Sequence, residues 1–122
     1  MAYDDDNIFA KILRGEIPCD KVYENDHALA FRDINPQTPV HILVIPKGRY
    51  VSMDDFSANA SEAEIAGLMR AVGHVAREAG IAESGYRILA NTGHDGLQEV
   101  PHFHVHVFGG KYLGRMIKPP EK

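Results

Sequence analysis

Three histidines alternate with apolar residues near the end of the chain: His102, His104 and His106. The residues between and after them are Phe103, Val105 and Val107. If residues 102–108 form a β-strand, the histidine side chains share one face, about 6.6 Å apart per step, and the apolar side chains share the other. One face would then belong to the core. The other face would carry imidazoles, which can ligate metals, attack electrophiles or transfer protons.

Two kinds of chemistry compete for these histidines. Neutral imidazoles at alternate positions can converge on one zinc ion. However, His102 and His106 have α-carbons about 13 Å apart on an extended strand, whereas two nitrogens on tetrahedral zinc lie only about 3.4 Å apart. A metal would therefore use two histidines and leave the third unused. The alternative uses all three, with one imidazole as nucleophile or general base and the others orienting it and binding an anionic group.

The loop before the histidines favours the second kind of chemistry. It covers residues 91–101 and is rich in glycine, and Gly109 and Gly110 follow the histidines. Glycines allow backbone N–H groups to approach a bound oxyanion, and the amides of Asn91 and Gln98 add neutral donors. This composition suits a phosphate group better than a metal ion.

Composition excludes several classes of protein. A chain of 122 residues fits one domain, with 44% hydrophobic and 25% charged residues as in ordinary soluble domains. The net charge of -4 gives no basic surface for nucleic acid. The single Cys19 excludes an internal disulfide and a cysteine-cluster zinc site. The acidic N-terminus and the lack of an apolar run of about 18 residues predict a cytoplasmic protein without a membrane partner.

The elements that must position these residues follow from hydrophobic spacing. An acidic lead-in at residues 1–6 precedes a short helix that Asn7 caps and Gly15 ends. Ser61 and Glu64 form a capping box that opens a long helix ending at Gly80. Residues 47–60 are expected to be a loop with at most one helical turn. Strands are expected at residues 21–24, 27–33, 40–45, 86–91 and 102–108. The pattern predicts an α+β domain with a mainly antiparallel five-stranded sheet, one long helix and one short helix.

Several separate segments in this order resemble the histidine-triad (HIT) family, and within it the Hint branch of nucleoside phosphoramidases. The segments are Asn7–Pro18, Ala30–Gln37, His41–Lys47 and the histidine run with its two glycines. The resemblance extends from about Asp6 to Arg115. It implies one HIT domain over residues 1–122 with a HIT-like fold, in which the tail at 111–122 is the least family-like part.

The resemblance also implies an enzyme, a purine nucleoside phosphoramidase that hydrolyses the P–N bond of AMP–amine conjugates through a nucleotidyl-histidine intermediate. His104 would be the nucleophile, His102 would share a hydrogen-bond network with His41, and His106 would donate to the phosphate. Asp33 would accept hydrogen bonds from the ribose hydroxyls. The other nucleotide-binding positions would be Ile8, Phe9, Ile12, Phe31 and Ile34 around the base, and Asn91, Leu97, Gln98 and Glu99 around the phosphate. Without the resemblance, His41 would be interpreted as a satisfied core histidine, as a single histidine in a buried strand usually is, and Asp33 could be a turn residue.

The sequence departs from the family at a few positions. Ala28 and Arg49 stand where certain relatives carry a Cys and a His that bind zinc, so neither a metal nor another cofactor is expected. Glu99 stands where several relatives place a hydroxyl residue against the phosphate, and a carboxylate there would be repulsive unless it turned away. His27, His74 and His94 are expected on the surface.

Two rival functions stay open. A dinucleoside polyphosphate hydrolase of the Fhit-like branch would use the same triad, and a non-catalytic nucleotide-binding adaptor would keep the same residues. The expected partners are a purine nucleotide, as an AMP or GMP conjugate, and a second copy of the chain. Small residues on the long helix, Gly67 and Ala71, could admit a second helix, and relatives pair through this helix and an edge strand. No nucleic acid is expected as a partner.

Overall fold

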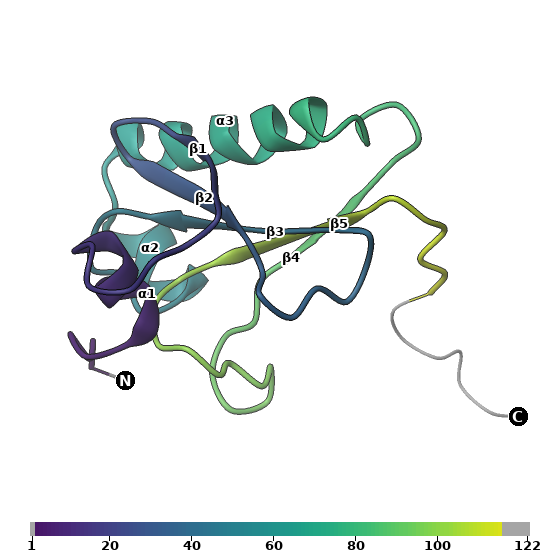
Figure 1. The fold of residues 1–122 in the computed structure, drawn as a ribbon. Helices are drawn as coiled ribbons and strands as arrows, with labels where there is room; N and C mark the ends of the chain where they lie inside the picture. The colour runs from purple at the N-terminus through teal and green to yellow at the C-terminus, as the bar shows by residue number, and fades with distance from the viewer. Residues whose placement is uncertain (1, 116–122) are drawn as a thin grey trace, which may run out of the picture.

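A five-stranded antiparallel sheet forms the centre of the protein in the computed structural model, which describes residues 2–115 (Figure 1). The strands lie in the order β1-β2-β3-β5-β4. They are β1 (Lys21–Glu24), β2 (Ala28–Arg32), β3 (Val40–Pro46), β4 (Arg87–Leu89) and β5 (Val105–Gly109). The helices are α1 (Ile8–Leu13), α2 (Met53–Asn59) and α3 (Glu62–Glu78). The predicted α+β class and antiparallel five-stranded sheet are confirmed. Of the predicted tail, residues 116–122 lie outside the described residues.

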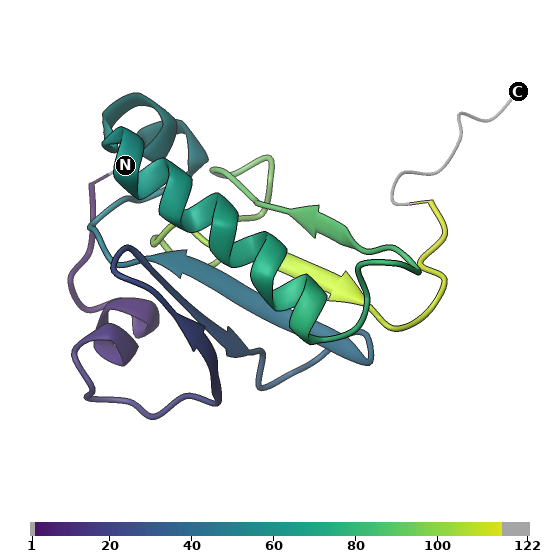
Figure 2. The same ribbon diagram turned by 90° about the horizontal axis from the view of Figure 1, so that it is seen from above.

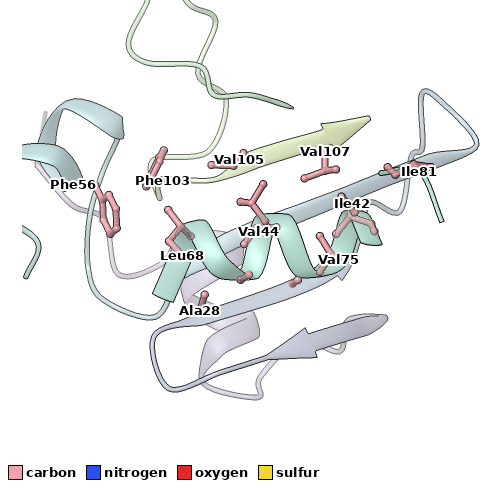
Figure 3. Packing of buried hydrophobic residues seen from close by; sticks show 14 residues of the cluster. Ala28, Ile42, Val44, Phe56, Leu68, Val75, Ile81, Phe103, Val105 and Val107 are labelled. Carbon is pink, nitrogen blue, oxygen red and sulfur yellow. The ribbon is translucent and has the colours of Figure 1, made fainter. Parts of the chain in front are cut away.

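Helix α3 covers one face of the sheet (Figure 2). Its apolar positions recur at helical spacing and pack on strand residues that point to the same side, so that Leu68, Val44 and Val107 are completely buried (Figure 3). Burying a side chain of this size contributes about 1.5 to 3 kcal/mol to folding. This layer is therefore the main apolar core. No helix among the described residues is long and apolar enough to cross a membrane.

The ends of the two predicted helices follow local signals in the sequence. Ser61 Oγ accepts from the backbone N–H of Glu64 at 3.1 Å, and Glu64 returns a bond to the Ser61 N–H at 3.0 Å, which completes the predicted capping box. Gly80, with a φ of 75°, follows the end of α3. At α1, Asn7 Oδ1 accepts from the Ala10 N–H at 2.9 Å, and Gly15 has a φ of 78°. These local predictions are confirmed.

A third helix, α2, forms where the sequence predicted a loop. Ser52 caps it, and the Asp55 carboxylate accepts from the Val51 N–H at 2.8 Å. Phe56 is its one buried residue and packs against Tyr50 and Phe103. A helix of two turns with a single buried side chain has no periodic pattern of apolar residues that a sequence could reveal. The prediction of one long and one short helix therefore missed α2 and was wrong in the number of helices.

The small residues of α3 serve packing within the chain. A Cβ added to Gly67 would stand 2.8 Å from Cβ of His27, and the Gly67 carbonyl accepts from Asn25 Nδ2 at 3.0 Å. Ala71 is completely buried in the core. The inference that these two residues admit a second helix is therefore wrong. The large apolar side chains that α3 exposes are instead Ile65 and Met69.

The histidine run is only partly a strand. Pairing of β3 with β5 ends at Val44 and Val105, so residues 102–104 lie beyond the hydrogen-bonded ladder. The predicted alternation of side chains nevertheless holds. Phe103, Val105 and Val107 point into the core under α3 (Figure 3). The histidines point to the opposite side.

Candidate active site

The face of the sheet opposite α3 brings together segments that are distant in the chain. His106 lies on β5 and His41 on the neighbouring strand β3, while Asp33 directly follows β2. The ring of Phe9, from α1, packs edge-on against His104 with 4.9 Å between ring centroids. The strand order β2-β3-β5 explains why these residues meet.

His41 determines which nitrogen of His106 carries a proton. The backbone N–H of Gln37 donates to His41 Nδ1 at 3.2 Å, so the neutral His41 ring carries its proton on Nε2. That nitrogen lies 3.0 Å from Nδ1 of His106 and 3.4 Å from Oδ2 of Asp33. Nδ1 of His106 therefore accepts, and its own proton lies on Nε2. His106 thus holds one N–H group that its neighbours do not use.

His104 carries its proton on the other ring nitrogen, Nδ1, and not on Nε2 as in His106. Its Nδ1 lies 2.7 Å from the backbone carbonyl oxygen of His102. A carbonyl only accepts, so Nδ1 carries the proton and Nε2 carries a lone pair. A neutral imidazole with one nitrogen fixed and the other free to react is the form that nucleophilic or general-base chemistry requires.

His102 has a different place from the one predicted. It is completely buried, its Nε2 lies 2.9 Å from the Pro46 carbonyl oxygen, and its Nδ1 lies 2.6 Å from the Tyr3 hydroxyl. Both ring nitrogens are used, and His41 bonds to His106 instead. The predicted network between His102 and His41 is therefore wrong. Alternation on a strand could not reveal this, because Tyr3 is distant in the sequence.

Burial keeps these histidines neutral. Desolvation lowers the pKa of His102 to about 4. Desolvation, with repulsion from His104 and His41, lowers the pKa of His106 to about 4. Burial also lowers the pKa of His104 and His41, although the charge of Asp33 opposes the shift in both. At neutral pH the rings therefore adopt the uncharged states that their hydrogen bonds require.

A cleft of about 300 Å³ opens beside His104 and His106. Seven of the predicted site residues line it: Phe9, Asp33, Asn91, Leu97, Glu99, His104 and His106. Four further lining residues were not predicted: Gln37, Leu43, Gly96 and Val100. They come from loops and strands whose meeting depends on the tertiary fold, and no local pattern marks them.

The residues predicted around the base lie mostly outside this cleft. Ile8 is exposed on α1, and Ile34 is 92% exposed beside Asp33. Ile12 lines a separate cleft behind α1. Phe31 is buried in a small apolar cluster with Phe9.

Gln98 holds the loop instead of pointing into the cleft. Its Oε1 accepts from the Gly93 N–H at 3.0 Å. Its Nε2 donates to the carbonyl oxygens of Val51 at 2.6 Å and Val100 at 3.0 Å. These bonds occupy the side-chain amide, so in this arrangement Gln98 fixes the shape of the loop that contributes Leu97 and Glu99.

Two carboxylates face the cleft. Asp33 Oδ1 accepts from the Asn35 N–H at 2.8 Å and closes a turn, while Oδ2 faces His41. Glu99 lines the cleft as well. Its charge, like that of Asp33, opposes the burial that lowers the pKa of His104. The Glu99 carboxylate is therefore close enough to affect a negatively charged ligand.

One group of side chains could hold a divalent metal ion. Ligand atoms of Asp33, His41 and His106 all lie within 4.8 Å of one another. The sequence arguments against a metal considered the three alternating histidines and the positions of Ala28 and Arg49, and did not cover this group. A metal here would take the nitrogens that now join His41 to His106, and would thus break the bond that sets the His106 tautomer.

The sequence matches a known family over most of its length. A family model described as the HIT domain matches residues 14–113. The chain belongs to the HIT domain family. The resemblance stated from the sequence is confirmed.

Relatives of this HIT-domain protein cover nearly the whole chain. It is 73% identical over 115 residues to an uncharacterised 13.2 kDa HIT-like protein of Azospirillum brasilense, covering 94% of each chain. It is 45% identical over 113 residues to the purine nucleoside phosphoramidase of Escherichia coli, covering 93% of this chain and 94% of that one. Among solved structures, a HIT family hydrolase from Clostridium thermocellum superimposes with a TM-score of 0.85 at 37% identity, over 94% of this chain and 99% of that one.

Proposed function

We propose that this HIT-domain protein hydrolyses the P–N bond of purine nucleoside phosphoramidates such as AMP–amine conjugates. The observation that carries the proposal is the bond from His104 Nδ1 to the His102 carbonyl, because it leaves a reactive lone pair on Nε2 beside a cleft. The 45% identity to the Escherichia coli purine nucleoside phosphoramidase supports the substrate class.

In the proposed reaction, His104 Nε2 attacks the α-phosphorus, and the bond between phosphorus and the amine nitrogen breaks. The departing amine nitrogen takes a proton from a water molecule in the cleft and leaves as a neutral amine, while the N–H of His106 Nε2 donates a hydrogen bond to a phosphate oxygen. The hydroxide formed from that water attacks the phosphorus, and the bond between phosphorus and His104 breaks to release AMP. The net reaction consumes one water and yields AMP and the free amine.

The nucleotide would lie along the cleft from the sheet towards α1. Asp33 Oδ2 would accept from a ribose hydroxyl, and the Asn91 amide would donate to a phosphate oxygen. Exposed Ile8 and Ile34, with Ile12 and Phe31, remain the proposed walls of the base site. An apolar side chain as exposed as Ile34, next to Asp33, suits a position that a bound base would cover.

The test is turnover of an AMP–amine substrate, followed by rapid acid-free quenching of a single turnover. We expect AMP bound covalently to His104 through an acid-labile P–N bond. An adduct on His102 or His41 would contradict the role of His104, and binding of AMP without any turnover would favour the non-catalytic adaptor.

A second candidate, dinucleoside polyphosphate hydrolysis, is favoured by one observation. A further cleft of about 400 Å³ shares Asn91 and His106 with the first and is also lined by Arg87 and Lys111. Two cations that line the same cleft as His106 could bind an anionic leaving group. Comparing kcat/KM for an AMP–amine and for diadenosine triphosphate distinguishes the two functions: the phosphoramidase proposal requires the first value to be larger.

We also propose a cytoplasmic homodimer. The apolar residues Ile65 and Met69 on α3 are exposed. So is Ile88 on the edge strand β4, which pairs with Val107 and thus points to the α3 side. A second copy could cover these residues and also pair with the open edge. A monomer by light scattering at micromolar concentration would refute the dimer.

A further inference from the structure

The N-terminal segment lies against the face of the sheet that carries the histidines. The three aspartates are exposed, as expected for an acidic lead-in. Tyr3, however, turns inward, and its hydroxyl oxygen lies 2.6 Å from Nδ1 of His102. The aromatic rings of these two residues also pack edge-on, with centroids 5.6 Å apart.

The direction of this hydrogen bond follows from the other partner of His102. The carbonyl oxygen of Pro46 can only accept, so His102 Nε2 carries the proton. Nδ1 of the neutral ring must then accept, and the Tyr3 hydroxyl donates to it. Because His102 has no exposed surface, water does not reach this nitrogen, and without Tyr3 it would be a buried acceptor with no donor.

Tyr3 is itself held in place by charged side chains. The Arg49 guanidinium carbon lies 4.9 Å from the centre of the Tyr3 ring. Arg49 also donates to both carboxylate oxygens of Asp5, at 2.9 and 3.0 Å. Arg49 therefore restricts the segment in two ways, through its cation over the Tyr3 ring and through its ion pair with Asp5.

The segment matters because His104 lacks the support of the sheet. The ladder between β3 and β5 ends at Val105, so the backbone of residues 102–104 depends on other contacts. These contacts include the bond from the Phe103 N–H to the Tyr50 carbonyl at 2.7 Å and the two bonds to the His102 ring. The carbonyl oxygen of His102 in turn accepts a hydrogen bond from the Nδ1–H group of His104.

We infer that Tyr3 is a positioning residue: it fixes His102, whose carbonyl orients His104, so that residues 2–6 form part of the active site. The inference rests on the proposed function only for its kinetic readout.

The test replaces Tyr3 by phenylalanine, which keeps the ring and removes the hydroxyl. We expect kcat for an AMP–amine to fall about tenfold, with KM within about twofold and a melting temperature lowered by several degrees, because Nδ1 of His102 loses its donor. Nitrogen-15 spectra of the imidazoles should show a shift of His102 Nδ1 and a mixed tautomer at His104. The matched control is Tyr23→Phe, because Tyr23 stacks on His74 away from the cleft.

A double-mutant comparison adds a second measurement. Arg49→Gln should lower kcat about threefold in the parent protein but have no further effect once Tyr3→Phe is present, because both changes act through one contact. An unchanged kcat and unchanged His102 and His104 signals in Tyr3→Phe would overturn the inference. If the parent protein turns over no phosphoramidate, the proposed function fails. The imidazole spectra still test whether the hydrogen bond from Tyr3 to His102 affects His104.

Discussion

Alternate residues of the segment 102–107 lie on opposite faces of the sheet, and the two faces differ in the interactions that stabilise them. Towards α3, Phe103, Val105 and Val107 enter an apolar core without a buried charged group. On the other face, His102 and His104 are equally buried but polar. Among residues 2–115, no buried side-chain nitrogen or oxygen lacks a hydrogen-bond partner. The comparison indicates that the first face stabilises the fold by burying apolar surface. The second face depends instead on the direction of individual hydrogen bonds.

The largest effect should come from the polar face. His104→Ala should lower turnover of an AMP–amine by at least about a thousandfold, because it removes the covalent route. AMP affinity should stay within about tenfold, or roughly 1.4 kcal/mol, since Asp33 and the cleft walls are unchanged. Single-turnover rates and calorimetric titration with AMP measure the two quantities. Residual turnover close to that of the parent would show that another residue is the nucleophile.

The apolar face should respond in the opposite way. Leu68→Ala removes a completely buried side chain of α3 and should lower the free energy of unfolding by about 2 to 5 kcal/mol. At a temperature where the variant is folded, kcat should stay within about twofold, because Leu68 does not reach the cleft. Denaturant unfolding and steady-state kinetics provide the check, with Met53→Ala, at an equally exposed position on α2, as control. A loss of kcat without a loss of stability would refute the division between the faces.

Acid should lower the free energy of unfolding through the buried histidines of the polar face. The pKa of His102 in the fold is about 4, whereas that of a histidine in the unfolded chain is about 6.5. The unfolded chain therefore binds protons first as the pH falls, so the free energy of unfolding should decrease between about pH 6.5 and pH 4. His102 alone would account for about 3 kcal/mol of that decrease. Urea unfolding at several pH values tests this, and equal stability at pH 7 and pH 5 would contradict it.

Replacing Glu99 should have a smaller effect, on AMP affinity, which tests the electrostatics of the polar face. Glu99→Gln removes a negative charge from the cleft and should tighten AMP binding about three- to tenfold, or roughly 1 kcal/mol, with less gain at high salt. Exposed Glu83→Gln makes the same chemical change elsewhere. If both variants bind AMP equally well, the Glu99 carboxylate does not face the phosphate.

Removal of metal should have no effect. Because the bond between His41 and His106 already uses the nitrogens that a metal would take, we expect full activity after exhaustive chelation. Loss of activity that zinc restores would instead assign Asp33, His41 and His106 to a metal site.

The sequence predicted features that depend on neighbouring residues. The capping box of Ser61 and Glu64, the helical spacing of α3 and the alternation around His104 all arise within one element. The errors involve contacts between distant segments. Nothing near Gly67 indicates that His27 lies against it, and nothing near His102 indicates that Tyr3 and Pro46 occupy its ring. Gln98 was predicted from its donor chemistry, but that chemistry is used by the Val51 and Val100 carbonyls.

The alternation along residues 102–107 also limits how this gene segment can change. Insertion or deletion of one residue between His102 and Val107 would exchange the two faces, bringing valines to the cleft and imidazoles beneath α3. A change of the same size in the loop of residues 91–101 would leave the facing of every later side chain intact. We therefore expect length variation among functional variants to be confined to the loop, while within the histidine run only substitutions survive.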